Sequence, residues 1–314
     1  MSTTGTATTR VAAVDCGTNS IRLLVADIDP VAGTLTDVDR RMEVVRLGEG
    51  VDRTGRLAPQ ALERTFAACE RYAGVIDTLG ATRVRFAATS ATRDAANREE
   101  FTAGVRARLG VQPEVVSGDE EAGLSFAGAT RELQPGRFPP PYLVVDIGGG
   151  STELVLGDAA PLAGRSVDIG CVRLTERHLH DDPPTCAQVA AARADIDAGL
   201  DDAAASVPLH RTGTLVGVAG SVTTVAAMAL DLPAYDSAAI HLARIPAEAV
   251  HDVTTRLLNG ARTERAALPF MHPGRVDVIG AGALVLQAVV ERTGAHEVVA
   301  SEHDILDGLA WSLV

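Results

Sequence analysis

The sequence contains no lysine, and all 28 of its basic residues are arginine. This absence excludes a Walker phosphate-binding loop, a Schiff-base lysine and a catalytic lysine, because each needs an ε-amino group. With 41 acidic residues the formal net charge is −13, which argues against nucleic acid or an anionic membrane surface as a partner. An anion site in this chain must therefore use arginine, backbone N–H groups or a metal ion.

Cysteine and long apolar runs are also scarce. The four cysteines stand apart from one another, with no C-x-x-C pair and no compact disulfide spacing. The longest apolar run, Val278 to Leu286, is far shorter than the ~18 residues that a membrane span needs. The opening MSTTGTATTR has no charged segment followed by an apolar one. We therefore expect a reduced, cytoplasmic protein that does not enter a membrane.

An internal repeat organises the chain. The segment VAAVDCGTNSIRLLVAD, starting at Val11, and the segment YLVVDIGGGSTELVLGD, starting at Tyr142, share the form apolar run, Asp, x, Gly, two residues, Ser. Asp15 matches Asp146, and Ser20 matches Ser151. Apolar, β-rich residues on both sides of a Gly-containing turn predict a strand, a tight turn and a second strand in each copy.

The chain length of 314 residues, with 46% apolar and 22% charged residues, suits two globular domains of roughly 150 residues each. Helical spacing predicts long helices over 59–79, up to 109 and over 118–133 in the first half, and over 247–258 and 278–293 in the second. The Pro-rich stretch QPGRFPPP predicts a boundary, giving an N-terminal α/β domain over 1–133 and a C-terminal α/β domain over 134–314. The last helix, from Asp304, can pack back on the first domain. We expect ligands in an interdomain cleft where the two hairpin loops face each other.

Both loops suit phosphate, because glycine lets consecutive backbone N–H groups converge on phosphoryl oxygens. The alternative for one loop alone is a turn whose polar side chains satisfy their own backbone; two matched loops favour phosphate binding. Carboxylates next to the loops can hold Mg²⁺. The candidate phosphate-binding residues are Gly17, Thr18, Asn19, Ser20, Gly148, Gly149, Gly150 and Ser151, and the candidate metal ligands are Asp15, Asp146 and Glu153.

Two adjacent acids at 120 and 121 have different predicted roles. Ser117 to Glu120 spells S-x-x-E, a capping box that explains Glu120 structurally. Glu121 lies about 100° further around the predicted helix and can accept a proton from an attacking water, so it is the candidate general base. The alternative is a solvent-facing glutamate favoured by the helix dipole.

Three further features are weaker candidates. Arg93 follows a strand end and is a natural partner for phosphate oxygens, or else a solvated charge. Gly220 and Ser221 stand at a predicted strand-to-helix junction, which suits either an anion or a simple N-cap. The segment VDVIGAGALVLQ fails as a dinucleotide fingerprint because Val285 stands where a third glycine is required.

The segments DCGTNSIRLLVAD, SATR, SGDEEAGLSFAG, VVDIGGGSTELVLG, VGVAGSVTTVAA and SEHDILDGLAW occur in this order. Together they resemble the exopolyphosphatase and guanosine pentaphosphatase (Ppx/GppA) family, over about residues 10 to 313. The chain resembles the family's short actinobacterial form, which lacks the additional C-terminal helical domains of longer relatives.

This resemblance implies a duplicated actin-like, sugar-kinase-like (ribonuclease H-like) two-domain ATPase fold. It implies Mg²⁺-dependent hydrolysis of a terminal phosphoanhydride, with Mn²⁺ as an alternative ion, and a homodimer. In this sequence Glu121 matches the family's catalytic glutamate. Asp146 and Glu153 match acids of its metal and phosphate loop, Gly148 to Ser151 match the phosphate-binding turn, and Asn19, Ser20 and Arg93 match phosphate contacts.

The leading hypothesis is an exopolyphosphatase that releases orthophosphate from inorganic polyphosphate, favouring short chains because an extended positive track is missing. The alternatives are hydrolysis of guanosine pentaphosphate, phosphate transfer to a sugar, and a non-catalytic sensor of guanosine tetra- or pentaphosphate.

Overall fold

The computed structural model describes residues 8–314, which divide into two compact units. The first unit contains the residues up to Ser117 together with Ile305–Val314, and the second contains Gly118–Asp304. The sequence placed this boundary near residue 133 instead. The difference arises because helix α5 (Gly118–Thr130) packs on the sheet of the second unit, on strands β6 to β8, rather than with the elements that precede it.

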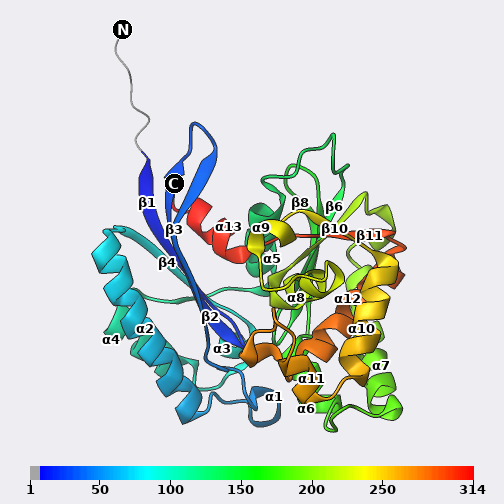
Figure 1. The fold of residues 1–314 in the computed structure, drawn as a ribbon. Coiled ribbons are helices and arrows are strands. Elements are labelled where there is room, and N and C mark those ends of the chain that lie inside the picture. The colour runs from blue at the N-terminus through cyan, green and yellow to red at the C-terminus, as the bar shows by residue number, and fades with distance from the viewer. Residues whose placement is uncertain (1–7) are drawn as a thin grey trace. The chain divides into compact units, whose positions relative to one another are not determined.

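The first unit is built on a five-stranded sheet in the order β3-β2-β1-β4-β5 (Figure 1). Strands β1 and β2 form the predicted hairpin, in which Asp15 stands opposite Arg22, and β4 and β5 run parallel to β1. The elements are β1 (Thr9–Cys16), β2 (Ser20–Asp29), β3 (Thr34–Val44), α1 (Val51–Thr54), α2 (Pro59–Leu79), β4 (Arg83–Ala88), α3 (Ser90–Asp94), α4 (Arg98–Leu109), β5 (Glu114–Val115) and α13 (Ile305–Trp311).

The second unit repeats this topology in a six-stranded sheet of order β10-β11-β9-β6-β7-β8. Its elements after α5 are β6 (Tyr142–Ile147), β7 (Thr152–Gly157), β8 (Pro161–Val167), α6 (Cys171–His178), α7 (Cys186–Ala204), β9 (Thr214–Val218), α8 (Ala219–Ala229), α9 (Ser237–Ile240), β10 (Ala243–Pro246), α10 (Ala247–Asn259), α11 (Arg262–Ala266), α12 (Ile279–Thr293) and β11 (Glu297–Ala300). Strands β6, β7 and β8 form an antiparallel meander, and β9 is parallel to β6, as β4 is to β1. The predicted duplication is confirmed.

Both faces of the second sheet are buried, and alternation along β6 separates them. Leu143, Val145 and Ile147 face a large core formed with α6, α7, α8, α10 and α12. Tyr142 and Val144 face a smaller core, which contains Ala122 and Phe126 of α5. Asp146 has the parity of this second set, so the backbone directs its carboxylate toward α5.

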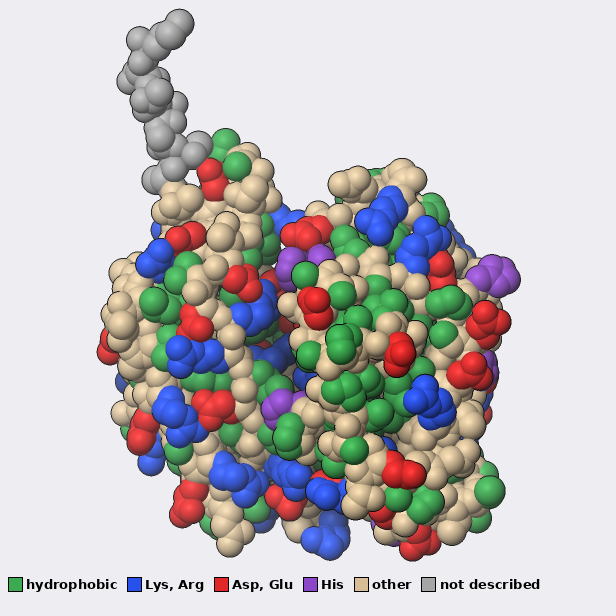
Figure 2. Space-filling model, viewed as in Figure 1, with side chains coloured by type: hydrophobic (Ala, Val, Ile, Leu, Met, Phe, Trp, Pro, Cys, Tyr) green, Lys and Arg blue, Asp and Glu red, His purple; other side chains and the backbone are tan. Residues whose placement is uncertain are grey.

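The first sheet carries α2 and α4 over one face, where Tyr72, Phe86 and Phe101 are fully buried. Helix α13, the last helix of the chain, contacts β1, β2 and β4 of the same sheet. No helix within residues 8–314 combines the length and apolar character needed to cross a bilayer. On the face drawn in Figure 2, arginines and carboxylates are interspersed.

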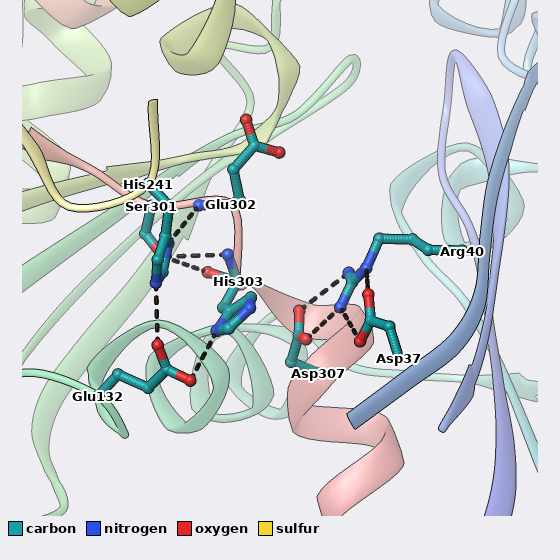
Figure 3. A network of polar contacts seen from close by, with 8 residues as sticks. All are labelled: Asp37, Arg40, Glu132, His241, Ser301, Glu302, His303 and Asp307. Carbon is teal, nitrogen blue, oxygen red and sulfur yellow. Dashed lines mark hydrogen bonds and ion pairs between the residues drawn. The ribbon is translucent and has the colours of Figure 1, made fainter. Parts of the chain in front are cut away.

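A buried ion pair attaches α13 to the first sheet. Asp307 is only 3% exposed and lies 2.5 Å from Nη2 of Arg40 on β3, and Asp37 holds the same guanidinium from the other side (Figure 3). The first part of β3, TLTDVDR, is polar and partly exposed at the sheet edge, so hydrophobic periodicity does not reveal it in the sequence.

We expect Arg40→Ala to lower the free energy of unfolding by about 3 kcal/mol, because it leaves the Asp307 carboxylate buried without its arginine. The neighbouring Arg41 pairs with Asp39 at an exposed position, so Arg41→Ala should cost less than about 0.5 kcal/mol. Urea denaturation of both variants measures the two effects. An equal loss of unfolding free energy in the two variants would show that the Arg40–Asp307 pair stabilises the fold no more than the exposed Arg41–Asp39 pair.

Candidate functional site

The glycine loop between β6 and β7 has its carbonyl groups anchored on one side. The carbonyl oxygens of Gly148, Gly149 and Gly150 accept hydrogen bonds from the backbone N–H groups of residues 170–173, at 2.8 to 3.3 Å, and Nε of Arg173 adds another to Gly150 at 2.7 Å. In a trans peptide the C=O and the following N–H point in opposite directions. The N–H groups of Gly149, Gly150 and Ser151 are therefore directed away from α6, as an anion-binding loop requires.

Gly170 makes this anchoring possible, and the sequence analysis did not identify it. A Cβ at this position would lie 2.3 Å from the carbonyl oxygen of Gly149 and 2.5 Å from the carbonyl carbon of Gly150. Only glycine allows the two backbones to approach this closely.

Three carboxylates converge beside this loop. Asp146 stands opposite Glu153 in the β6–β7 pair, and both have the strand parity that faces α5. Glu121, in the first turn of α5, is close enough to act electrostatically on Glu153. All three are at least nine-tenths buried. The structure thus brings together the predicted base and two of the three predicted metal ligands.

Hydroxyl groups hold two of these carboxylates in place. Ser125 of α5 donates a short hydrogen bond to Asp146. Ser151 and Ser166 both donate to Oε1 of Glu153 at 2.7 Å. Burial raises the pKa of Glu153 well above its usual value, and the charges of Glu121 and Asp146 raise it further, while the two serine hydrogen bonds lower it. Such a group of buried carboxylates favours an added cation or a shared proton.

The matching loop of the first unit has the same turn. The N–H of Gly17 donates to the carbonyl of Ser20 at 2.9 Å, as that of Gly148 donates to the carbonyl of Ser151 at 3.1 Å. The carbonyls of Thr18 and Asn19 accept bonds from residues 45, 46 and 48, which attach the loop to the segment after β3.

The two copies differ at one decisive position. The repeat aligns Arg22 with Glu153, and each stands directly opposite the aspartate of its own hairpin, Asp15 or Asp146. Arg22 donates to Asp15 from both Nε and Nη2, at 3.0 and 2.7 Å. Asp15, predicted as a third metal ligand, is thus neutralised within its own unit, which makes it a poorer ligand than Asp146.

Arg93 lies in the last turn of α3, where Nη1 donates to the carbonyl of Val116 at 3.0 Å. Three buried hydroxyls among the described residues have no hydrogen-bond partner: those of Ser90 and Thr92, on the same helix, and that of Thr18 in the first loop. Unsatisfied buried hydroxyls are uncommon and suit a polar ligand. The SATR segment signalled Ser90 and Thr92, but only its arginine was identified as a candidate.

The third glycine segment differs from the prediction. Helix α8 begins at Ala219, which has a positive φ of 68°, rather than at Ser221. The guanidinium of Arg275 covers Gly220, where an added Cβ would lie 2.3 Å from Cζ. Ser221 packs against Gly282 of α12, where an added Cβ would lie 2.2 Å from its Oγ. The role of Gly220 and Ser221 in phosphate binding stays a prediction.

The geometry is that of a candidate phosphate site: a glycine loop that presents N–H groups beside buried carboxylates, on a duplicated α/β fold. The same fold is seen in a nucleoside triphosphate hydrolase of Neospora caninum, at 10% identity and a TM-score of 0.53 over 98% of this chain and 93% of that one. The expected duplicated two-domain α/β fold is confirmed.

Residues 24–314 match the model of the Ppx/GppA phosphatase family, and the chain belongs to this family. It is 51% identical to Exopolyphosphatase 2 of Mycobacterium tuberculosis, over 98% of this chain and 99% of that protein. A crystal structure of an exopolyphosphatase-like protein superposes with a TM-score of 0.93 at 44% identity, covering 97% of both chains. The Aquifex aeolicus PPX-GPPA enzyme gives 0.81 at 30%, over 98% of this chain and all of that one.

We expect Gly170→Ala to lower the free energy of unfolding by about 1–3 kcal/mol, because the new methyl group overlaps the backbone of the phosphate loop. Gly164→Ala is the matched control, since a Cβ there meets no atom closer than 3.8 Å. Thermal unfolding compares the two variants. Equal stability of the two would contradict the close approach of residue 170 to the loop.

We expect Glu153→Gln to raise Tm at pH 7.5 in EDTA. A carboxyl group with a raised folded-state pKa binds more protons in the folded chain, so the free energy of unfolding falls as pH rises above about 4.5, the ordinary pKa. Glutamine removes this loss, so the gain in Tm should shrink toward pH 4.5. Glu49→Gln, at an exposed position, should leave Tm unchanged. A Tm gain for Glu153→Gln that does not vary with pH would contradict the raised pKa.

Proposed function

We propose that this chain is an exopolyphosphatase, which hydrolyses the terminal phosphoanhydride of inorganic polyphosphate and releases orthophosphate. The observation that carries this proposal is the convergence of Glu121, Asp146 and Glu153 beside the 148–151 loop. Phosphoryl transfer to water depends on positioning and charge neutralisation, and needs no covalent nucleophile. The 51% identity to Exopolyphosphatase 2 of Mycobacterium tuberculosis supports the choice of polyphosphate.

The donor set fits Mg²⁺, with Mn²⁺ as an alternative. Mg²⁺ prefers carboxylate oxygens, and the raised pKa of Glu153 indicates a site that favours added positive charge. Asp146 and Glu153 would hold the ion, and Asp15 is left out because Arg22 already neutralises it. When bound, the ion would neutralise negative charge on the phosphate oxygens.

The second unit would supply the remaining contacts to the phosphate from its backbone and side chains. The N–H groups of Gly149, Gly150 and Ser151 would donate to the phosphoryl oxygens, and Ser125 and Ser166 hold the carboxylates at their places. In the first unit, we propose that the Gly17–Ser20 loop and Arg93 contact phosphate as well, with Thr18, Ser90 and Thr92 as added donors.

Glu121 is the proposed general base. Its carboxylate takes a proton from water as the water oxygen bonds to the terminal phosphorus, and the bridging P–O bond breaks. Its burial keeps bulk solvent from competing for the carboxylate, and its place in the first turn of α5 fixes it relative to Ser125, one turn further on.

We expect Glu121→Gln to lower kcat by ~10²-fold or more with little change in KM, because glutamine keeps the shape but cannot accept the proton. Glu120→Gln is the matched control, since Glu120 lies on α5 but is exposed, and it should stay near wild type. Orthophosphate release from short polyphosphate measures both. Near-wild-type turnover in Glu121→Gln would remove it from the base role.

The substrate is tested by measuring orthophosphate release from short polyphosphate, long polyphosphate and guanosine pentaphosphate, with Mg²⁺ and with EDTA. We expect Mg²⁺-dependent release that is fastest for short chains, because arginines and carboxylates are interspersed on the face drawn in Figure 2 and the chain has no lysine. A higher kcat/KM for guanosine pentaphosphate than for polyphosphate would show that the nucleotide is the preferred substrate. Binding of these compounds without release of orthophosphate would show that the chain is a sensor and not an enzyme.

A further inference from the structure

Two histidines and a glutamate from separate segments of the second unit converge in a cluster that the proposed function does not use (Figure 3). Glu132 follows the end of α5, His241 caps the end of α9, and His303 lies between β11 and α13. Their side chains are 54%, 20% and 28% exposed, so an ion can enter from solvent.

The distances fit one small ion. Nε2 of His241 lies 3.0 Å from Oε2 of Glu132, and Nδ1 of His303 lies 3.6 Å from Oε1 of the same carboxylate. One donor atom from each of the three residues lies within 4.8 Å of the other two. In a tetrahedral zinc site with bonds of about 2.0–2.1 Å, neighbouring donors are about 3.3–3.4 Å apart. The two contacts, which end on different oxygens of Glu132, bracket this value, and a small closure would bring one donor atom of each residue onto one ion.

The segments that carry the donors are held in place. Ser301 donates from Oγ to the carbonyl of His303, and the N–H of His303 donates back to Oγ of Ser301, at 2.9 and 3.1 Å. The imidazole rings of His241 and His303 pack with their centroids 4.4 Å apart. Such preorganisation lowers the cost of gathering the ligands.

We propose that Glu132, His241 and His303 form a binding site for a transition-metal dication of the Zn²⁺ type. Imidazole nitrogen suits Zn²⁺, whereas Mg²⁺ and Ca²⁺ prefer oxygen, so this site differs in chemistry from the carboxylate group of Glu121, Asp146 and Glu153. Three protein donors leave a fourth position for water. The ion would tie the end of α5 to the segment that leads into Ile305, where the chain returns to the first unit.

Binding has a proton to displace. The N–H of Glu302 donates to Nδ1 of His241 at 3.2 Å, so neutral His241 carries its proton on Nε2, facing Glu132. For Nε2 to bind the ion, its proton would move to Nδ1, and the Glu302 N–H would lose its acceptor there. Two hydrogen bonds, from Glu302 to Nδ1 and from Nε2 to Glu132, would be exchanged for three metal–ligand bonds.

The test titrates ZnCl₂ into the full chain at pH 7.5 by calorimetry, with millimolar Mg²⁺ present to occupy the carboxylate site. We expect one Zn²⁺ per chain and a rise in Tm. His303→Ala should weaken binding at least about 10-fold. His241→Gln is a second variant, which keeps an acceptor for the Glu302 N–H but provides no imidazole, and it should weaken binding similarly.

The matched control is His178→Ala. His178 pairs with Asp195 at 2.9 Å, and within residues 8–314 it belongs to no group of three potential metal ligands, so its loss should leave Zn²⁺ binding unchanged. Cys186→Ser removes an exposed thiol and should also have no effect. The proposal is overturned if the wild type shows no Zn²⁺ binding, or if binding survives in both His303→Ala and His241→Gln, or if it is lost in His178→Ala, Cys186→Ser or Glu153→Gln instead.

Discussion

The second unit must accommodate three carboxylates that are buried on the same side of one sheet. Glu121, Asp146 and Glu153 repel one another, and burial strengthens this repulsion because little water screens it. Three serines offset part of the cost by donating to Asp146 and Glu153. The repulsion that the serines do not offset favours a proton or a cation among the three carboxylates. The same repulsion therefore lowers the free energy of unfolding and underlies the proposed binding of a divalent ion.

Comparison of the two repeats isolates the effect of the carboxylate cluster, because the first unit has the same hairpin without such a cluster. Arg22 faces Asp15 there, and the pair forms an ordinary partly buried ion pair. The second unit has Glu153 at the matching position, so an attractive pair is replaced by a repulsive one. Folding stability alone would favour arginine in both copies. The presence of glutamate therefore points to a role that requires negative charge, which is why the proposed chemistry is assigned to the second unit.

The sequence predicted most of the fold because its strongest signals are local. The two hairpins follow from apolar runs around glycine turns, and α2 follows from helical spacing with Pro59 at its start. Features that depend on distant contacts were missed. Strand β3 is polar at its start and exists because it pairs with β2. The unit boundary lies before α5 because the Phe126 side of that helix packs on β6 to β8, which no local pattern shows.

The candidate site residues divide in the same way, into those that local sequence patterns indicate and those that depend on contacts between distant segments. Glu121, Asp146 and Glu153 stand out in sequence, whereas Gly170 matters only through its approach to residues 149 and 150, and the Arg22–Asp15 pair only through strand register. Ser221 was assigned to phosphate from its local pattern, but its contact with Gly282 of α12 is a matter of tertiary packing. The Glu132, His241 and His303 cluster has no motif at all, because its members come from three separate segments.

The absence of lysine connects these observations. A flexible ammonium group can follow a phosphate chain through different positions, whereas backbone N–H groups and arginines fixed by hydrogen bonds hold it in one. In this chain the 148–151 loop is fixed by its carbonyls, Arg173 donates to Gly150, and Arg22 is engaged by Asp15. In the proposed reaction, positive charge at the phosphate would then be supplied by an exchangeable ion on an oxygen-only donor set. The nitrogen-rich cluster at Glu132 favours a different ion, so ligand chemistry can keep the two proposed metals apart within one unit.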